Sequence, residues 1–260
     1  SQSALSSAEI DKYPLINEEE IMAGARAARE AKAVRYCIVT SGRAPGSESL
    51  EAICHAASRI KRDIGISLCA SLGFLDEKGA RALKAAGIDR YNHNLNTSKD
   101  FYPSICSTHK YSERTETILQ ARGAGLELCS GALLGMGESD EDIIDLALAF
   151  REFKPESIPV NFLHPIEGTA LEKVDYLTPL KCLAILCLFR FLNPQSELRA
   201  SGGREYHLRS LQPLALYPAN SIFVSGYLTT LGQKPEEAWK MIEDMGFEVE
   251  KEITQELAIK

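Results

Sequence analysis

The chain of 260 residues has room for one large α/β domain, and its 45% hydrophobic and 25% charged residues are typical of a globular protein. A net charge of −7 argues against a nucleic-acid-binding surface, and no apolar run approaches the roughly 18 residues of a membrane helix. The 7 cysteines lack the short spacings of a secreted disulfide framework, so we expect a reducing, cytoplasmic compartment.

Capping residues mark the predicted helices along the chain. Asn, Asp, Ser and Thr side chains accept hydrogen bonds from the first helical turn, and proline suits the first helical position. The predicted helices begin near Asn17, Leu50, Asp76, Ser112, Ser139, Thr178 and Pro235. Glycine or an Asn-Pro pair ends three of them, at Gly87, Asn193 and Gly246.

Short β-type runs alternate with these helices. The predicted strands are 34–39, 65–70, 91–95, 127–133, 158–162, 198–201 and 220–224. Their roughly 30-residue rhythm indicates a parallel sheet with helical crossovers. We therefore predict a TIM-type (β/α)8 barrel of about seven βα units. A doubly wound sheet is the competing fold, but its Gly-x-Gly-x-x-Gly fingerprint is absent after the first strand.

The chain opens Ser1-Gln2-Ser3, without Met or a signal peptide, so we expect the first strand of the barrel to be missing. Residues 1–260 carry no linker, repeat or low-complexity stretch, which predicts a single domain. Residues 250–260 are predicted to form a charged C-terminal tail.

Three cysteines occupy predicted inward positions of strands, where Val, Ile and Leu are usual: Cys37, Cys69 and Cys129. A single cysteine is often only a small buried hydrophobe. Thiolates that converge from separate strands suit an iron–sulfur cluster or zinc. The remaining cysteines, Cys54, Cys106, Cys182 and Cys187, are interpreted as structural.

Asparagines recur two apart at Asn92, Asn94 and Asn96, which would place them on one face of a strand. Such a row predicts a hydrogen-bonding wall for a polar ligand, with Asn161 on another strand. Arg199 would need an anionic partner if it lies inside the barrel, and would otherwise be a surface residue near a strand end.

The sequence resembles the biotin synthase family of radical S-adenosylmethionine (SAM) enzymes over residues 1–249. The segments that carry the resemblance are 91–98, 129–131, 157–161, 201–205 and 219–223. The resemblance implies a TIM-type barrel that inserts sulfur into dethiobiotin to form biotin. It also implies a 4Fe–4S cluster that cleaves SAM to a radical, and an inner 2Fe–2S cluster that donates the sulfur.

The resemblance also assigns site residues. Cys37, Cys69, Cys129 and Arg199 match the ligands of the inner cluster. Asn94, Asn96, Leu133 and Asn161 match SAM-contacting positions, and Asn92, Asn94, Asn161, Thr229 and Thr230 match the dethiobiotin site. The implied partners are an electron donor such as flavodoxin or ferredoxin and, as a homodimer, a second copy of the chain.

The chain departs from the family pattern in two ways. Asn96 stands where many members carry Asp, whose carboxylate is the stronger acceptor for ribose hydroxyls. The Cys-x-x-x-Cys-x-x-Cys loop of the 4Fe–4S cluster is absent, so we expect the chain as written to be inactive and a longer form to be active. The alternatives are another radical SAM barrel enzyme, or a non-catalytic barrel that binds an iron–sulfur cluster or a small acid.

Overall fold

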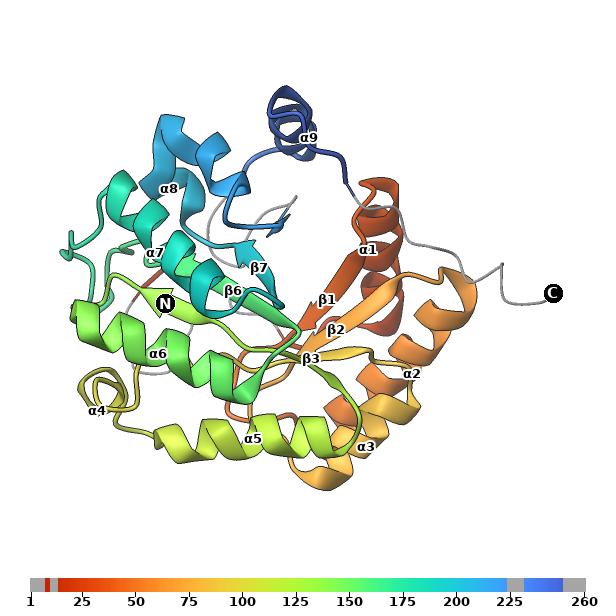
Figure 1. Ribbon diagram of the computed structural model, residues 1–260. Helices are drawn as coiled ribbons and strands as arrows, with labels where there is room; N and C mark the ends of the chain where they lie inside the picture. Colours follow the sequence, from red (N-terminus) through yellow and green to blue (C-terminus); the bar gives the residue numbers. More distant parts are fainter. Residues whose placement is uncertain (1–7, 10–13, 224–231, 250–260) are drawn as a thin grey trace.

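Parallel strands curl into a partial barrel in the computed structural model, which describes residues 8–9, 14–223 and 232–249 (Figure 1). The strands are β1 Arg35–Val39, β2 Ser67–Ser71, β3 Arg90–Asn92, β4 Glu127–Cys129, β5 Ala132–Leu134, β6 Ser157–Phe162, β7 Glu197–Ala200 and β8 Ser221–Ile222. They lie in the order β1-β2-β3-β4-β6-β7-β8, and β5 pairs with β6. Among the described strands β1 and β8 are the two edges, so this part of the barrel is open between them. The predicted TIM-type α/β class is confirmed.

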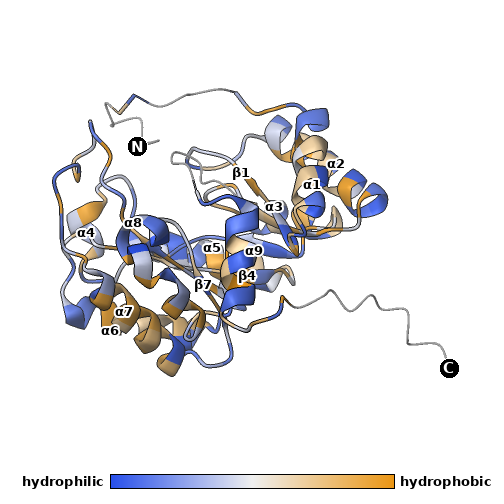
Figure 2. Ribbon diagram, turned by 90° about the horizontal axis from the view of Figure 1, so that it is seen from above, coloured by the Kyte–Doolittle hydropathy of each residue, from blue (hydrophilic) through white to orange (hydrophobic). Residues whose placement is uncertain are grey.

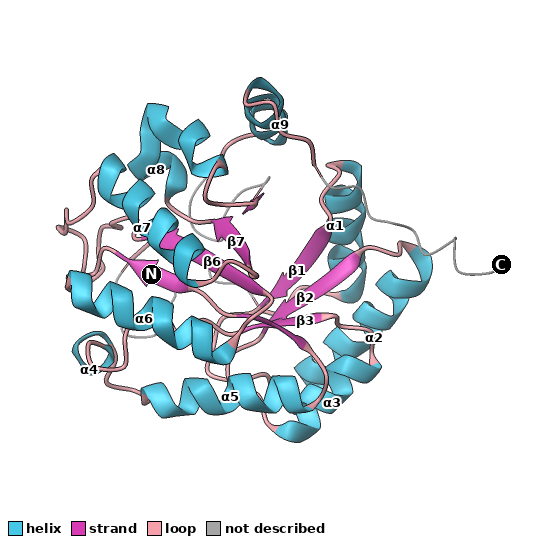
Figure 3. Ribbon diagram, viewed as in Figure 1, coloured by secondary structure: helices cyan, strands magenta, loops and turns pink. Residues whose placement is uncertain are grey.

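Helices surround the outside of the curled sheet (Figures 1 and 3). They are α1 Glu18–Glu30, α2 Ser47–Asp63, α3 Glu77–Ala85, α4 Tyr102–Ile105, α5 Tyr111–Gly123, α6 Asp140–Phe153, α7 Pro179–Leu192, α8 Arg204–Leu208, the 3₁₀ helix η1 Arg209–Leu216, and α9 Pro235–Asp244. In the described part of the chain, none is both long and apolar enough to span a bilayer.

Four of the predicted caps are confirmed. The Asn17 side chain accepts from the Glu20 backbone at 3.0 Å, and Asp76 accepts from the Gly79 backbone at 2.7 Å. Ser139 and Thr178 cap α6 and α7 in the same way. The cap predicted at Ser112 is wrong. The N-cap of α5 is Lys110, and Ser112 lies two residues later, inside the first turn.

Several predicted strands are shorter in the structure, among them 220–224, of which Ser221–Ile222 form β8, and two of them end or break for a structural reason. The run predicted at 127–133 breaks between β4 and β5, where the backbone of Gly131 packs so closely on β6 that a Cβ would lie 2.0 Å from the Pro159 carbonyl oxygen. The run predicted at 91–95 pairs only to Asn92, and the chain then turns through a left-handed Asn96, whose φ is 70°. Both features depend on neighbouring strands rather than on local propensity.

The outer face of the sheet is apolar and forms the core with the helices. Leu68, Leu128, Ile158 and Leu198 alternate with inward residues and are at most 2% exposed. They belong to one continuous cluster that includes Phe189 of α7. The apolar colouring of α6 and α7 in Figure 2 reflects this packing. The inner face of the sheet, in contrast, carries cysteines and polar residues.

Candidate functional site

The inner face of the sheet brings the three predicted cysteines together. Cys37 on β1 is in register with Cys69 on β2, and Cys129 on β4 is in register with Asn92 on β3. The thiol of Cys69 hydrogen-bonds with those of both Cys37 and Cys129. All three are free cysteines, with Cys69 and Cys129 buried and Cys37 partly buried. The structure thus brings the three cysteines together on one face of the sheet.

Burial and mutual contact hold the two inner thiols in their protonated form. The hydrogen bond from Cys129 lowers the pKa of Cys69, but the contact with Cys37 and the burial outweigh it, so that pKa lies well above its usual range. The pKa of Cys129 is also raised, by its contact with Cys69 and by burial, against the opposing charges of Arg199 and Arg90. Such thiols become thiolates readily only beside a strong cation.

Arg199 lies on the same inner face, and its charge interacts with Cys129 and Cys69. Its Nε donates to the Ser221 hydroxyl at 3.0 Å, and its Nη2 is ion-paired with Glu197. Burial alone would raise the pKa of Glu197, but the charges and hydrogen bonds of Arg199 and Arg90 bring it to about 2. The sequence left two interpretations of Arg199 open, inside the barrel or at the surface, and the structure places it on the inner face. Its anionic partner there is Glu197, which the sequence did not single out.

Two buried polar atoms beside the cysteines have no hydrogen-bond partner in the described part of the chain. The Ser157 hydroxyl, in register with Cys129, is one, and the Nε of Arg35 is the other. Unsatisfied buried polar groups are costly, so they favour a polar or charged group bound between the strands. Among the described residues no three His, Cys, Asp or Glu side chains could hold a single metal ion. A two-iron cluster spreads its ligands over two metals, which the cysteines on separate strands fit better.

The asparagine row keeps its alternation although the strand is short. Asn92, Asn94 and Asn96 are all partly exposed, whereas His93 and Leu95 between them are buried. The prediction that His93 faces the other side and is structural agrees with its burial, which lowers its pKa to about 3. The strand predicted at 91–95 is shorter in the structure, because β3 ends at Asn92, although Asn96 forms an isolated bridge with Ala132.

Backbone contacts fix the orientation of two asparagine side chains. Asn94 accepts from the Gly131 backbone at 3.0 Å, which ties the loop after β3 to the break between β4 and β5. Asn161 donates to the Ala132 carbonyl at 2.9 Å and accepts from the Gly202 backbone at 3.0 Å. Each amide retains a second donor proton and further acceptor capacity for a ligand.

Leu133 and Asn96 lie beside these amides. Leu133 is in register with Asn161, and its backbone N–H donates to the Asn96 carbonyl at 2.8 Å. The structure therefore gathers Asn94, Asn96, Leu133 and Asn161 around the broken strand. Thr229 and Thr230 lie outside the described residues.

Two functional candidates were missed in the sequence. Arg114 on α5 donates to the Asn94 carbonyl at 2.8 Å, but nothing local to α5 indicates that contact. Glu197 stands two residues before Arg199, and that spacing on one strand was a usable signal of a same-face ion pair.

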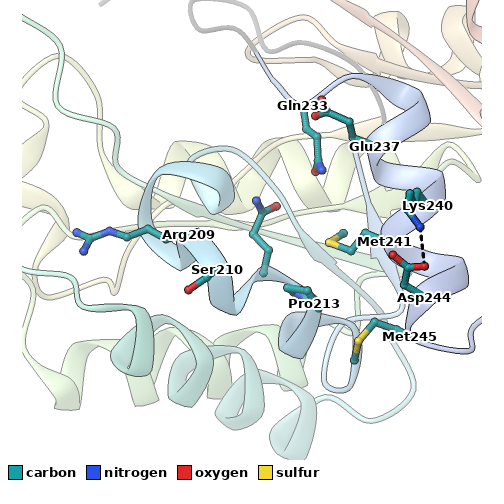
Figure 4. Close-up of a pocket in the computed structure, with 10 residues that line it drawn as sticks. Arg209, Ser210, Pro213, Gln233, Glu237, Lys240, Met241, Asp244 and Met245 are labelled. Carbon is teal, nitrogen blue, oxygen red and sulfur yellow. Dashed lines mark hydrogen bonds and ion pairs between the residues drawn. The ribbon is translucent and has the colours of Figure 1, made fainter.

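A separate hollow lies between η1 and α9 (Figure 4). Its lining includes Gln212, Gln233 and the ion pair of Lys240 with Asp244 at 2.9 Å. Gln212 and Gln233 also accept from the buried Arg204, at 2.6 and 3.2 Å. None of the predicted site residues within the described part of the chain lines this hollow.

Two family models match the chain. The radical SAM superfamily model matches residues 5–150, and the Biotin and Thiamin Synthesis associated domain matches residues 159–248. The first match includes α1 and extends into α6, with all three inner cysteines, and the second extends from within β6 through α9, with Arg199.

Curated relatives match nearly the whole chain. The biotin synthase of Acaryochloris marina is 52% identical over 248 residues, which are 95% of this chain and 72% of the relative. The biotin synthase of Bacillus subtilis strain 168 is 50% identical over 250 residues, 96% of this chain and 75% of the relative. That of Magnetococcus marinus is 51% identical, over 96% of this chain and 78% of the relative.

Solved structures share the fold at low identity. Methylornithine synthase (PylB) superposes with a TM-score of 0.80 at 19% identity, covering 94% of this chain and 76% of that one. The FeFe-hydrogenase maturase HydG from Carboxydothermus hydrogenoformans gives 0.76 at 20% identity, covering 92% and 60%. These likenesses concern the barrel alone.

Proposed function

The chain belongs to the biotin synthase family of the radical SAM superfamily, and on that premise we propose that its inner sheet face holds the iron–sulfur cluster that gives up sulfur to dethiobiotin. Membership of the family implies SAM and iron–sulfur clusters as cofactors, dethiobiotin as substrate and a reductant as partner. When bound, the inner cluster would provide sulfur, and SAM would provide the radical that removes hydrogen from the substrate.

The observation that carries the proposal is the meeting of Cys37, Cys69 and Cys129 with Arg199, whose side chain is 12% exposed. Four such residues would weaken an ordinary barrel interior, where branched aliphatic residues pack. Thiols with raised pKa values are poor ligands until a cation takes the proton's place, which an iron cluster does. Arg199 would be the fourth ligand, a cation that holds the cluster more weakly than a fourth thiolate.

The segment 92–96, which carries the asparagine row, would bind SAM and the substrate beside the cluster. Asn94, Asn96, Leu133 and Asn161 would contact SAM, and Asn92 would join Asn94 and Asn161 in contacting dethiobiotin. The backbone bonds of Asn94 and Asn161 support this role because they hold the amides in fixed orientations before a ligand arrives. We include Thr229 and Thr230 in the substrate site.

We also propose the wider setting of the enzyme. The reductant would be a flavodoxin or ferredoxin, the chain would form a homodimer, and residues 1–260 would act as one domain with a charged tail at 250–260. All of the 7 cysteines are free, which supports a reducing, cytoplasmic compartment.

Anaerobic reconstitution with iron and sulfide tests the cluster site. We expect visible charge-transfer absorption and about one inner cluster per chain. Replacing Cys37, Cys69 or Cys129 by Ala should abolish it, whereas Cys187→Ala, at an exposed helical thiol, should leave it unchanged. Full iron and sulfide content in the triple variant would refute the assignment.

SAM affinity of the anaerobically loaded protein tests the loop. Asn96→Asp should raise the affinity several-fold, because a carboxylate is the stronger acceptor for ribose hydroxyls. Asn92→Asp, on the substrate side, is the control and should change SAM affinity little. Equal effects of the two substitutions would contradict the division between SAM and substrate positions.

A further inference from the structure

A charged network lies on the inner face at the starting ends of the strands. Arg35, Arg90, Glu127 and Glu197 are the first residues of β1, β3, β4 and β7. Glu197 accepts from Arg90 at 2.8 Å and lies 3.7 Å from Arg35, while Arg90 also donates to Glu127 at 2.9 Å. The Arg90 side chain is only 7% exposed and that of Glu197 25%, so their ion pair is largely removed from water, whereas Glu127 is 47% exposed.

Glu197 joins this network to Arg199. The two residues stand two apart on β7, so their side chains share one face. One carboxylate oxygen of Glu197 contacts Nη2 of Arg199, and the other contacts Arg90. The carboxylate is therefore anchored on one side by Arg90 while it holds Arg199 on the other.

The guanidinium of Arg199 is thereby fixed at two of its three nitrogens. Nη2 is held by Glu197 and Nε by the Ser221 hydroxyl at 3.0 Å, while the Phe223 ring lies 5.2 Å from the guanidinium carbon. Nη1 of Arg199 donates no hydrogen bond to the described part of the chain. An arginine has five N–H donors in a rigid plane, so fixing two nitrogens fixes the direction of the third.

We propose that Glu197 is the positioning residue that selects Nη1 of Arg199 as the nitrogen presented to the inner cluster. The inference rests on the proposed cluster site. Arg90 keeps the Glu197 carboxylate in place, whereas the Glu127 side chain is 47% exposed and contacts Arg90 without touching Glu197 or Arg199. The three arginines and two glutamates of the network leave one positive charge, which offsets part of the negative charge that three thiolates would bring.

The test begins with the protein as prepared without iron, where the exchange of the Arg199 guanidinium protons is followed by nuclear magnetic resonance. We expect slow exchange in the wild type and exchange about tenfold faster or more in Glu197→Ala, which loses a charge-assisted hydrogen bond. Glu127→Ala, which touches Arg90 but not Arg199, is the matched control and should change the exchange less than about twofold. A mobile Arg199 in the wild type, or equal effects of the two variants, would overturn the proposal.

The second measurement uses the anaerobically reconstituted protein. Glu197→Ala should release iron to a chelator about tenfold faster than the wild type, because Arg199 then lacks its fixed direction. Glu197→Gln preserves the shape and one acceptor, so it should keep iron release near the wild-type rate while shifting the cluster's reduction potential upward. Unchanged iron release in Glu197→Ala would count against the positioning role.

The two measurements separate the two proposals. If the wild-type chain binds no inner cluster but Glu197 still holds Arg199 rigid, the cluster site is refuted and the contact between Glu197 and Arg199 is confirmed. If the chain binds the cluster while Arg199 moves freely, the cluster site is supported and the positioning role of Glu197 is refuted. Glu197→Gln guards against a folding failure of Glu197→Ala, because the amide replaces the carboxylate without a cavity.

Discussion

The two faces of the sheet have opposite compositions although they alternate along the same strands. Leu68, Ile158 and Leu198 face outward and are completely buried against helices, while Cys69 and Arg199 face inward among other polar side chains. Apolar burial stabilises a fold, whereas buried polar groups contribute little or cost free energy. The comparison indicates that the outer layer holds the protein together and that the inner face serves binding.

The largest expected loss of stability comes from the outer layer. Phe189→Ala removes a ring that is 0% exposed and packs 5.9 Å from the ring of Phe150, so it should lower the free energy of unfolding by about 3–5 kcal/mol. Phe191→Ala, on the same helix but 84% exposed, should change it by less than about 0.5 kcal/mol. Urea denaturation measures both, and similar losses would show that this layer does not carry the stability.

The glycine in the break between β4 and β5 should have the next largest effect on stability. In Gly131→Ala the new Cβ would meet the Pro159 carbonyl oxygen at 2.0 Å, which should cost about 1–3 kcal/mol as the strands move apart. Gly123→Ala in α5 meets nothing within 4 Å and should be neutral or stabilise by up to about 1 kcal/mol. Thermal unfolding of the pair gives the comparison, and a tolerated Gly131→Ala would mean that the break in the strand can relax.

Helix caps distinguish the observed start of α5 from the predicted one. Ser139→Ala removes a capping hydroxyl from α6 and should cost about 1 kcal/mol. Ser112→Ala lies inside the first turn of α5 and should cost nothing measurable. If both substitutions cost the same in urea denaturation, then Ser112 rather than Lys110 would be the cap.

The smallest change in stability is expected on the inner face. Cys129→Ala deletes one sulfur and should lower the free energy of unfolding of the iron-free protein by about 1 kcal/mol or less. The same substitution should abolish the inner iron cluster in reconstituted protein. Urea denaturation and iron analysis of one preparation test both halves. A loss of several kcal/mol without iron would show that the inner face is part of the stabilising core after all.

Much of this division could be predicted from alternation alone. The periods of two that place Cys37, Cys69 and Cys129 inward also place their apolar neighbours outward, and the parallel register then aligns them. Caps such as Asp76 were predictable because they act within one turn. The period of two also survives at Asn94, beyond the end of the paired strand.

The remainder depends on contacts between residues distant in the chain. The break at Gly131 exists because Pro159 approaches from the next strand, and no local propensity records that approach. Arg114 on α5 donates to the Asn94 carbonyl in the loop after β3, and nothing in the sequence of α5 predicts that contact. The contact of Glu197 with Arg199 could have been predicted, because two residues two apart on a strand point to the same face.

Asn96 limits the way in which this loop can change over evolutionary time. Its φ of 70° lies in the left-handed region, which Gly, Asn and Asp adopt far more readily than branched or bulky residues. Its backbone carbonyl accepts a hydrogen bond from Leu133, and its backbone N–H donates to the Gly131 carbonyl. These contacts hold the backbone conformation whatever the side chain. Few residue types can therefore replace Asn at this position. Two of those that fit, Asn and Asp, have a side-chain oxygen that can accept a hydrogen bond from a ribose hydroxyl. If Asn96 contacts the SAM ribose as proposed, the backbone conformation favours residues that can make this contact, because both Asn and Asp adopt it.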